Sequence, residues 1–424
     1  MYDIVTHHFS RVYRRVRVIG ITLWSGPCAR TVAPSADSAT LWPMSLISPA
    51  VTPFDPSVYA DRLVRAASEA EQRGLGALLI TPSHDYAYLL GYRAPALERL
   101  TCLVLAADGV PTLVLPRLEE ALARHALGPL ADGIAFRPWG ETEDPFAIVR
   151  KLLTGVGGTM RVGVQDQMWA RFVLRLRAAL DPIELVEAGH AMAALRRVKT
   201  EPEIDRLRAA ATAADQAMRA ITSERLSGRS EAEVSRRISA LLLDAGHDTA
   251  DFAIVGSGPN SASPHHEPGE RIIQQGDAVV LDIGGSLAGY CSDTTRTAFV
   301  GSPPDEFAEL YGALAAAQEA ACQAVRPGVP AEDVDRAARD IIAEAGFGER
   351  FIHRTGHGIG METHEEPYVV EGNAEPLRPG HAFSIEPGIY VTGQWGARIE
   401  DIVICTTDGG ERLNQTSREL FIVG

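Results

Sequence analysis

The segment 279–285 reads Val279-Val280-Leu281-Asp282-Ile283-Gly284-Gly285, an apolar strand that is interrupted by a single acidic residue. An unpaired carboxylate in the centre of an apolar strand costs several kcal/mol, so we expect Asp282 to face a cation. Asp293 follows, and the glycines between the two acids allow the chain to return as an antiparallel neighbour. Both carboxylates then meet across one hairpin, although two surface turn aspartates are the commoner explanation of such a pair.

The same pattern occurs twice near the C-terminus, in Phe383-Ser384-Ile385-Glu386-Pro387-Gly388 and in Ala397-Arg398-Ile399-Glu400-Asp401-Ile402-Val403. Each glutamate interrupts a predicted apolar strand. Four carboxylates in the core strands of one domain cannot all stay ionised unless divalent cations lie between them. Together these acids favour a metal site over the surface-turn explanation.

An imidazole ligand is expected from the segment 353–367, which contains His353, His357 and His364 among several glycines. His353 and His357 have the spacing of a zincin helix pair, but the glycines disfavour a helix and Arg354 replaces the glutamate of that motif. A loop that carries imidazoles to the sheet fits better. Carboxylates with one imidazole suit Mn²⁺, Co²⁺, Zn²⁺ or Fe²⁺ rather than a structural zinc site.

A second histidine pair, His265-His266, follows Gly256-Ser257-Gly258-Pro259-Asn260 and precedes the strand with Asp282. These glycines lack the third glycine and the following helix of a dinucleotide motif, so a nucleotide site is not supported. Ser286 does not lie in a Gly-x-Ser-x-Gly nucleophile elbow either. The chemistry therefore points to metal, with histidines around it.

Apolar periodicity divides the chain into two domains. Residues 45–185 read as mixed α/β, with helices expected at 56–73, 117–126, 144–154 and 169–180, strands at 75–81 and 161–164, and a hairpin of 101–106 with 111–116. Residues 186–200 read as a linker. Residues 200–424 begin with a capping box of Thr200 and Glu203 and read as α+β. Helices are expected at 200–217, 230–245, 305–326 and 331–346, with strands at 250–256, 278–284 and 294–300 and an antiparallel sheet covered by helices on one side.

Residues 1–43 are Arg-rich and then Pro/Ser-rich, which predicts a disordered leader or a start codon assigned too early. The 424 residues carry a formal net charge of −15, which disfavours nucleic acid as a partner. The five cysteines are spread without a Cys-x-x-Cys pair, which favours a reducing cytoplasm over a disulfide framework. No stretch has the length and apolarity of a membrane span, so we expect no membrane partner.

These motifs resemble the creatinase/aminopeptidase P/prolidase family of pita-bread metallopeptidases, over about residues 195–424, and more loosely its creatinase-like N-terminal domain over 45–185. Bacterial Xaa-Pro dipeptidases are the most similar members. The resemblance implies a pita-bread catalytic domain, a homodimer and two divalent metal ions, with Mn²⁺ favoured. It also implies hydrolysis of the bond between an N-terminal residue and proline, in dipeptides or in longer peptides.

By the same resemblance, the metal ligands are Asp282, Asp293, His357, Glu386 and Glu400, with Asp293 and Glu400 bridging the two ions. His265, His353 and His364 take the positions of the family's catalytic histidines, and Arg398 that of an arginine beside the ligands. Glu386 is expected to move the proton as well.

Three other functions fit part of the pattern. A methionine-type aminopeptidase shares the ligands but usually lacks the N-terminal domain. A creatinase-like amidinohydrolase shares the fold without the metal ligands, and a peptide-binding pseudoenzyme would not need all five of them. An intact ligand set with an N-terminal domain favours the Xaa-Pro metallopeptidase.

Overall fold

The computed structural model describes residues 54–106, 109–154 and 161–424. The leader predicted at residues 1–43 lies outside these ranges. Within them, no helix combines the length and the apolar character that are needed to cross a membrane.

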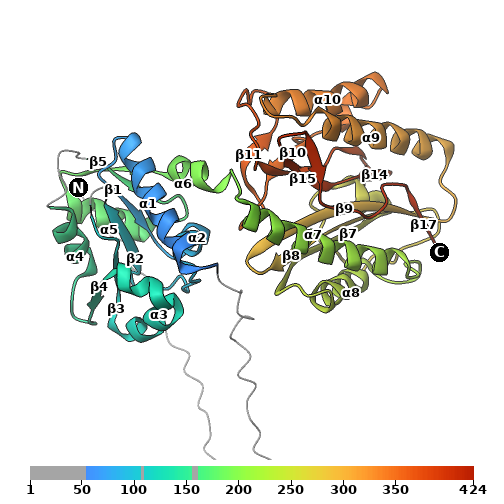
Figure 1. Ribbon diagram of the computed structural model, residues 1–424. Coiled ribbons are helices and arrows are strands. Elements are labelled where there is room, and N and C mark those ends of the chain that lie inside the picture. The colour runs from blue at the N-terminus through green and yellow to red at the C-terminus, as the bar shows by residue number, and fades with distance from the viewer. Residues whose placement is uncertain (1–53, 107–108, 155–160) are drawn as a thin grey trace, which may run out of the picture. The chain divides into compact units, whose positions relative to one another are not determined.

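The first part of the described chain builds one six-stranded mixed sheet with the strand order β4-β3-β2-β1-β5-β6 (Figure 1). Its strands are β1 (Ala77–Ile80), β2 (Cys102–Ala106), β3 (Thr112–Pro116), β4 (Ala135–Trp139), β5 (Arg161–Val164) and β6 (Glu184–Glu187). Its helices are α1 (Pro56–Gln72), α2 (His84–Leu90), α3 (Glu120–Leu127), α4 (Pro145–Leu153), α5 (Ala170–Leu180) and α6 (Gly189–Arg196). The predicted hairpin is confirmed, because β2 and β3 pair antiparallel.

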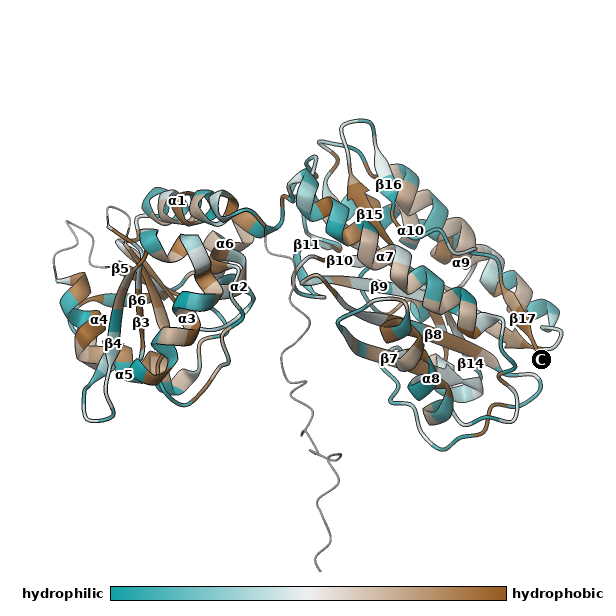
Figure 2. Cartoon of the chain, turned by 60° about the horizontal axis from the view of Figure 1, so that its bottom comes forward, coloured by the Kyte–Doolittle hydropathy of each residue, from teal (hydrophilic) through white to brown (hydrophobic). Residues whose placement is uncertain are grey.

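Strand alternation gives this sheet two apolar faces. Leu78 and Ile80 belong to the core that includes α1, while their neighbours Ala77 and Leu79 belong to the core that includes α4 and α5. Successive side chains of a strand point to opposite faces, so a sheet buried on both sides reads as a continuous apolar run. Figure 2 shows these strands as hydrophobic segments between amphipathic helices.

The second part of the described chain contains three sheets rather than the single antiparallel sheet that the sequence suggested. The orders are β17-β9-β8-β7, β11-β10-β12-β15-β16 and β13-β14. The strands are β7 (Thr249–Ser257), β8 (Ala278–Leu287), β9 (Tyr290–Val300), β10 (Gly356–Gly358), β11 (Glu365–Val369), β12 (Ala382–Ile385), β13 (Gly388–Val391), β14 (Trp395–Arg398), β15 (Asp401–Cys405), β16 (Gly410–Arg412) and β17 (Phe421–Val423). The helices are α7 (Glu201–Thr222), α8 (Glu231–Asp244), α9 (Asp305–Ala324) and α10 (Ala331–Glu344).

The four helices of this part pack in two pairs on different strands. Val279, Leu281 and Ile283 of β8 share a core with α7 and α8, whereas Phe383 and Val403 share a core with α9 and α10. Because side chains alternate along a strand, Asp282 points away from its helices. The helix α7 begins at the predicted capping box of Thr200 and Glu203.

The hairpin of β8 and β9 brings the first two acids together. In its antiparallel register Asp282 lies opposite Thr295 and Gly284 lies opposite Asp293, so the two aspartates are diagonal neighbours on one face. Ala288 and Gly289 form the turn with positive φ angles of 50° and 83°. The predicted hairpin between the two acids is therefore confirmed.

Two sequence expectations differ from the structure in detail. Glu386 and Glu400 do not lie inside strands but at strand breaks, between β12 and β13 and between β14 and β15. Pro387 cannot donate a ladder hydrogen bond, and the Glu400 N–H donates to the Thr295 carbonyl of β9 at 3.1 Å instead of to a neighbour in its own sheet.

The second difference concerns the stretch 186–200, which the sequence predicted as a linker. It contains the helix α6, whose Ala191, Met192 and Leu195 join the first domain's core.

Candidate metal centre

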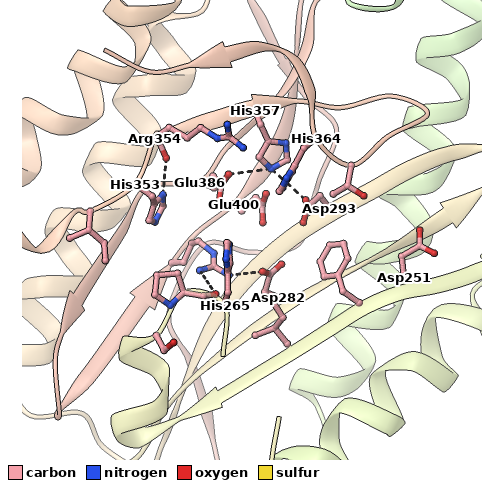
Figure 3. A pocket seen from close by; sticks show the side chains of 17 residues that line it. Asp251, His265, Asp282, Asp293, His353, Arg354, His357, His364, Glu386 and Glu400 are labelled. Carbon is pink, nitrogen blue, oxygen red and sulfur yellow. Dashed lines mark hydrogen bonds and ion pairs between the residues drawn. The ribbon is translucent and has the colours of Figure 1, made fainter. Parts of the chain in front are cut away.

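One cavity of about 900 Å³ collects the predicted site residues (Figure 3). All nine of them line it: His265, Asp282, Asp293, His353, His357, His364, Glu386, Arg398 and Glu400. They come from β8, β9, β10, β14 and the loops beside them, so residues more than a hundred positions apart meet at one place. The fold therefore brings all nine predicted residues to one cavity wall.

Asp293, His357 and Glu400 form the centre of the set. Their ligand atoms all lie within 4.8 Å of one another, and each residue is buried. The His357 Nε2 atom lies 3.2 Å from Glu386 Oε1 and 3.7 Å from Asp293 Oδ2. A divalent cation between these oxygens and this nitrogen would meet the mixed oxygen and imidazole donors that first-row metals accept.

Two orphaned oxygen atoms test whether a metal fits. Asp282 Oδ1 and Glu400 Oε1 are buried and accept no hydrogen bond from the described residues. A buried carboxylate oxygen without a partner is costly, and a bound cation would satisfy both atoms. The donor set and the free lone pairs thus fit a metal.

The electrostatics of the site reflect several buried acids at close range. Burial, followed by the charges of Glu400 and Asp282, raises the pKa of Asp293 well above its ordinary value. Burial likewise raises the pKa of Glu386 to about 7, and Asp282 adds to this effect against the opposing charge of Arg398. Burial and then Glu386 raise the pKa of Glu400. Positive charge brought into the cavity would lower all three values.

The ring of His357 is oriented by the backbone around it. Its Nδ1 atom lies 3.1 Å from the Gly358 carbonyl, which can only accept, so Nδ1 carries the proton and Nε2 presents its lone pair to the acids. The His357 N–H donates to Ser384 Oγ at 3.0 Å, and that hydroxyl donates to Glu386 Oε1 at 3.2 Å. Burial and the neighbouring His364 lower the pKa of His357 to about 3, so the neutral, ligating form is the one present at pH 7.

Tyr390 was not predicted, yet it links two of the predicted residues. Its hydroxyl accepts from Arg398 Nη1 at 2.9 Å and lies 2.9 Å from His353 Nε2. The other ring nitrogen, His353 Nδ1, lies 2.7 Å from the Arg354 carbonyl and must be the donor there, so Tyr390 donates to Nε2. Arg398 in turn donates to Asp282 Oδ2 at 2.5 Å and to Thr295 Oγ1 at 3.1 Å. Arg398 is thereby fixed beside the acids.

Replacing Tyr390 with Phe is expected to lower kcat by about tenfold and to destabilise the fold by about 1–3 kcal/mol, because a buried arginine N–H and a buried imidazole nitrogen lose their partner. Thermal unfolding and steady-state kinetics measure the two effects. Tyr311→Phe is the matched control, since that hydroxyl donates to the Arg418 carbonyl at 2.9 Å outside the cavity. A similar loss of kcat in both variants would contradict the role of Tyr390 in the site.

The adjacent residues His265 and His266 have different surroundings. His265 lines the cavity, while His266 Nε2 lies 2.8 Å from Glu231 Oε2. Glu231 is fully buried and also accepts from Ser257 N at 2.8 Å and Asn260 Nδ2 at 3.0 Å. Burial opposes ionisation of Glu231, but hydrogen bonds from Ser257 and His266 outweigh it and lower the pKa. Glu231 therefore anchors the loop that carries His265.

Several other lining residues were missed. The cavity wall includes the apolar side chains of Phe252, Ile254 and Ile352, and the charged side chains of Asp251 and Arg354. Thr295 lies behind the lining residues and donates to Glu400 Oε2 at 2.7 Å; the sequence could have indicated it, because it lies two residues beyond Asp293 on the same face of β9. The others lie on segments whose packing against the acids is set by tertiary structure alone.

A buried set of acids with one oriented imidazole, and with two oxygens that no described residue satisfies, forms a candidate metal centre. Comparison with known proteins shows that this centre belongs to a metallopeptidase fold. Residues 205–407 match the model of metallopeptidase family M24, and residues 62–198 match the creatinase/prolidase N-terminal domain. The chain belongs to the metallopeptidase family M24, and the predicted order of a creatinase-like N-terminal domain and a pita-bread catalytic domain is confirmed.

Named relatives cover most of the chain. The probable dipeptidase PepE of Mycobacterium tuberculosis is 48% identical over 372 residues, which are 87% of this chain and 98% of the relative. The crystal structure of dipeptidase PepE from Mycobacterium ulcerans matches with a TM-score of 0.84 at 48% identity, over 88% of this chain and 99% of that one. The Xaa-Pro dipeptidase from Bacillus anthracis matches with a TM-score of 0.78 at 31% identity, over 86% and 100%.

Proposed function

We propose that this chain is a dinuclear metal-dependent hydrolase of the peptide bond between an N-terminal residue and proline. The observation that carries the proposal is that Asp282, Asp293, His357, Glu386 and Glu400 line one cavity, with two carboxylate oxygens that accept no hydrogen bond from the described residues. The preference for proline at the second position is supported by the similarity to the Xaa-Pro dipeptidase of Bacillus anthracis. The substrate is then a small peptide.

The four carboxylates and the imidazole of His357 would hold two divalent ions, and Asp293 and Glu400 would serve as ligands of both. Mn²⁺ is favoured for oxygen-rich ligation of this kind. When bound, the ions supply Lewis acidity for the scissile carbonyl and activate the attacking water. Glu386, whose Oε1 accepts a hydrogen bond from Ser384 Oγ at 3.2 Å, would accept a proton from the attacking water at its carboxylate and return it to the leaving nitrogen.

The histidines of the cavity act on the substrate in this proposal. The His364 ring centroid lies 4.0 Å from that of His357, and burial followed by the charge of Arg354 lowers the pKa of His364. A neutral imidazole there can donate a hydrogen bond to the developing oxyanion, and His265 can do so from the opposite loop. His353, whose pKa burial and Arg398 lower to about 4, positions Tyr390 and Arg398.

We also propose a homodimer in a reducing cytoplasm and domain limits of 45–185 and 200–424. The free, buried Cys102, Cys291, Cys322 and Cys405 support the reducing compartment. The family models that end at 198 and begin at 205 support the position of the domain boundary. The dimer is supported by the family resemblance.

The function is tested with an Xaa-Pro dipeptide and a longer Xaa-Pro-Xaa peptide, each incubated with metal-stripped protein with and without added Mn²⁺. Cleavage that depends on metal and on proline supports the proposal. Cleavage of the dipeptide alone defines a prolidase-type enzyme, and cleavage of the longer peptide an aminopeptidase P type. Two bound metals without cleavage of either peptide would contradict the proposal and favour a peptide-binding role.

A further inference from the structure

His364 lines the cavity of the candidate metal centre, but hydrogen bonds do not hold its ring there. Its ring lies beside that of His357 (Figure 3), with the two centroids 4.0 Å apart. The side chain of His364 is exposed, and its ring nitrogens make no hydrogen bond with any residue in the ranges that the structure describes. An imidazole without hydrogen bonds depends on the backbone that carries it and on the residues around it. The neighbours of His364 in the chain therefore decide where its ring lies.

Glu362, two residues before His364, is held by three side chains of the creatinase-like N-terminal domain. Its Oε2 atom lies 2.7 Å from Arg196 Nη2, and its Oε1 atom accepts from His84 Nδ1 at 3.1 Å and from Gln167 Nε2. The three donors lie at the start of α2, in the turn before α5 and at the end of α6. Burial opposes ionisation of Glu362, but the hydrogen bond from His84 and the charge of Arg196 outweigh it and lower the pKa to about 2. The carboxylate is therefore charged at pH 7, and its hydrogen bonds are charge-assisted.

Glu365, the residue after His364, is fixed by two cations. Lys199 Nζ donates to Glu365 Oε1 at 2.6 Å, and Arg196 Nη2 donates to Glu365 Oε2. Arg196 Nη1 also donates to Asp85 Oδ1 at 2.8 Å. His364 thus lies between two acids that share Arg196 as a partner. Both cations are buried, and removing one partner of a buried ion pair is strongly destabilising. Glu362, whose side chain is 18% exposed, is the better residue to change.

Glu362 also fixes the backbone at the start of this loop. The Gly360 N–H donates to the Glu362 carbonyl at 3.0 Å, and the Cys291 N–H of β9 donates to the Gly360 carbonyl at 2.8 Å. The loop is therefore tied on one side to the strand that carries Asp293 and on the other side to the N-terminal domain. Glu362 itself does not line the cavity of the metal centre, so any effect on the reaction has to pass through its neighbours.

We propose that Glu362 is a positioning residue for His364, and that the N-terminal domain takes part in the reaction by holding Glu362 in place. This inference rests on the proposed function, since it concerns a histidine that acts on the substrate of that site. A displacement of about 1 Å in a group that stabilises the transition state lowers the rate by as much as about 10²-fold. Loss of the contacts at Glu362 would allow such a displacement of His364 without removing any metal ligand.

The kinetic test compares the Mn²⁺-loaded wild type and Glu362→Gln on alanyl-proline, each alone and combined with His364→Ala. We expect Glu362→Gln to lower kcat by about 10- to 100-fold with KM changed less than about threefold, because the misplaced group acts in the transition state. In the His364→Ala background the same change should cost less than about twofold, because the residue that it positions is absent. An equal loss in both backgrounds would reveal a general structural defect and overturn the inference.

Glu366→Gln is the matched control, since it makes the same change two residues after His364. The Glu366 carboxylate lies 3.5 Å from His190 Nδ1 and 3.5 Å from Arg197 Nη1, so its ion pairs are long. Its kcat should stay within about twofold of the wild type. Gln167→Ala removes one neutral donor to Glu362 and should lower kcat by about two- to fivefold, which carries the test should Glu362→Gln fail to fold. Equal kcat losses in Glu362→Gln and Glu366→Gln would contradict the role of Glu362.

Hydrogen exchange separates this inference from the proposed function, because it requires no turnover. The amides of residues 359–366 are followed by mass spectrometry in the Mn²⁺-loaded wild type, Glu362→Gln and Glu366→Gln. We expect exchange to be about tenfold faster in Glu362→Gln and unchanged in Glu366→Gln. Faster exchange in Glu362→Gln, in a protein that cleaves no peptide, would support the held loop and contradict only the proposed function. Unchanged exchange in Glu362→Gln, with proline-dependent cleavage intact, would contradict only the role of Glu362.

Discussion

Replacing Asp293 with Asn is expected to remove metal and to lower kcat/KM by about 10³-fold or more, with the fold retained. The change keeps the size of the side chain and removes one charged oxygen from the cluster of Asp293, His357 and Glu400. Lewis-acid catalysis supplies several kcal/mol, and each factor of ten in rate corresponds to about 1.4 kcal/mol. Metal content by atomic emission and kcat/KM on a peptide substrate measure the two losses.

Thermal unfolding gives a second, independent reading of the same variant. Burial and the charges of Glu400 and Asp282 raise the pKa of Asp293, so in the metal-free protein its ionised form is destabilising once the pH exceeds its ordinary value of 3.8. Metal-free Asp293→Asn should therefore unfold at the same or a higher temperature than the wild type at pH 7. Added metal should stabilise the wild type by mass action and leave the variant unchanged.

Asp251→Asn provides the matched control for Asp293→Asn. Asp251 also lines the cavity, but its carboxylate accepts hydrogen bonds from Thr249 Oγ1 and Ser286 Oγ, both at 2.7 Å, and lies outside the proposed ligand set. Metal content should stay near the wild-type level in this variant. Full metal content and activity in Asp293→Asn would refute the assignment of Asp293 as a ligand.

The acids of the site could be found from the sequence because each one breaks a local rule. Glu386 and Glu400 gave this signal, although the structure places them at strand breaks. The β8–β9 hairpin could also be predicted from the sequence, because its glycines allow a turn between two strands of matching length.

The remaining parts of the site depend on contacts between distant segments. Tyr390 and Glu231 look like an ordinary strand residue and an ordinary first-turn helix residue, and only the folded chain brings them to His353 and His266. Strand pairing also depends on distant segments. The division of the strands into three sheets could therefore not be predicted from the alternation of apolar and polar residues along each strand. The sequence of α6 resembles a linker because basic residues at its C-terminal end follow a short apolar face.

Replacing Asp401 with Asn is expected to destabilise the catalytic domain by about 3–5 kcal/mol, the usual effect of removing one partner from a buried ion pair. Asp401 and Arg296 are both fully buried, and Arg296 Nη2 donates to Asp401 Oδ1 at 2.7 Å. Gln318 Nε2 donates to the other carboxylate oxygen at 3.0 Å. An asparagine amide keeps one acceptor but leaves the guanidinium charge uncompensated in the interior. Urea unfolding measures the loss.

The same substitution should weaken metal binding by about 10- to 100-fold, because groups behind a metal ligand orient it. Arg296 Nη1 donates to the Glu400 carbonyl at 2.6 Å, so a shift of Arg296 moves the backbone of a proposed ligand. Asp333→Asn is the control: its ion pair with Arg336 is partly exposed, and its loss should cost under about 1 kcal/mol and leave metal binding intact. If Asp401→Asn were as stable as this control, the buried pair would not be what holds Glu400 in place.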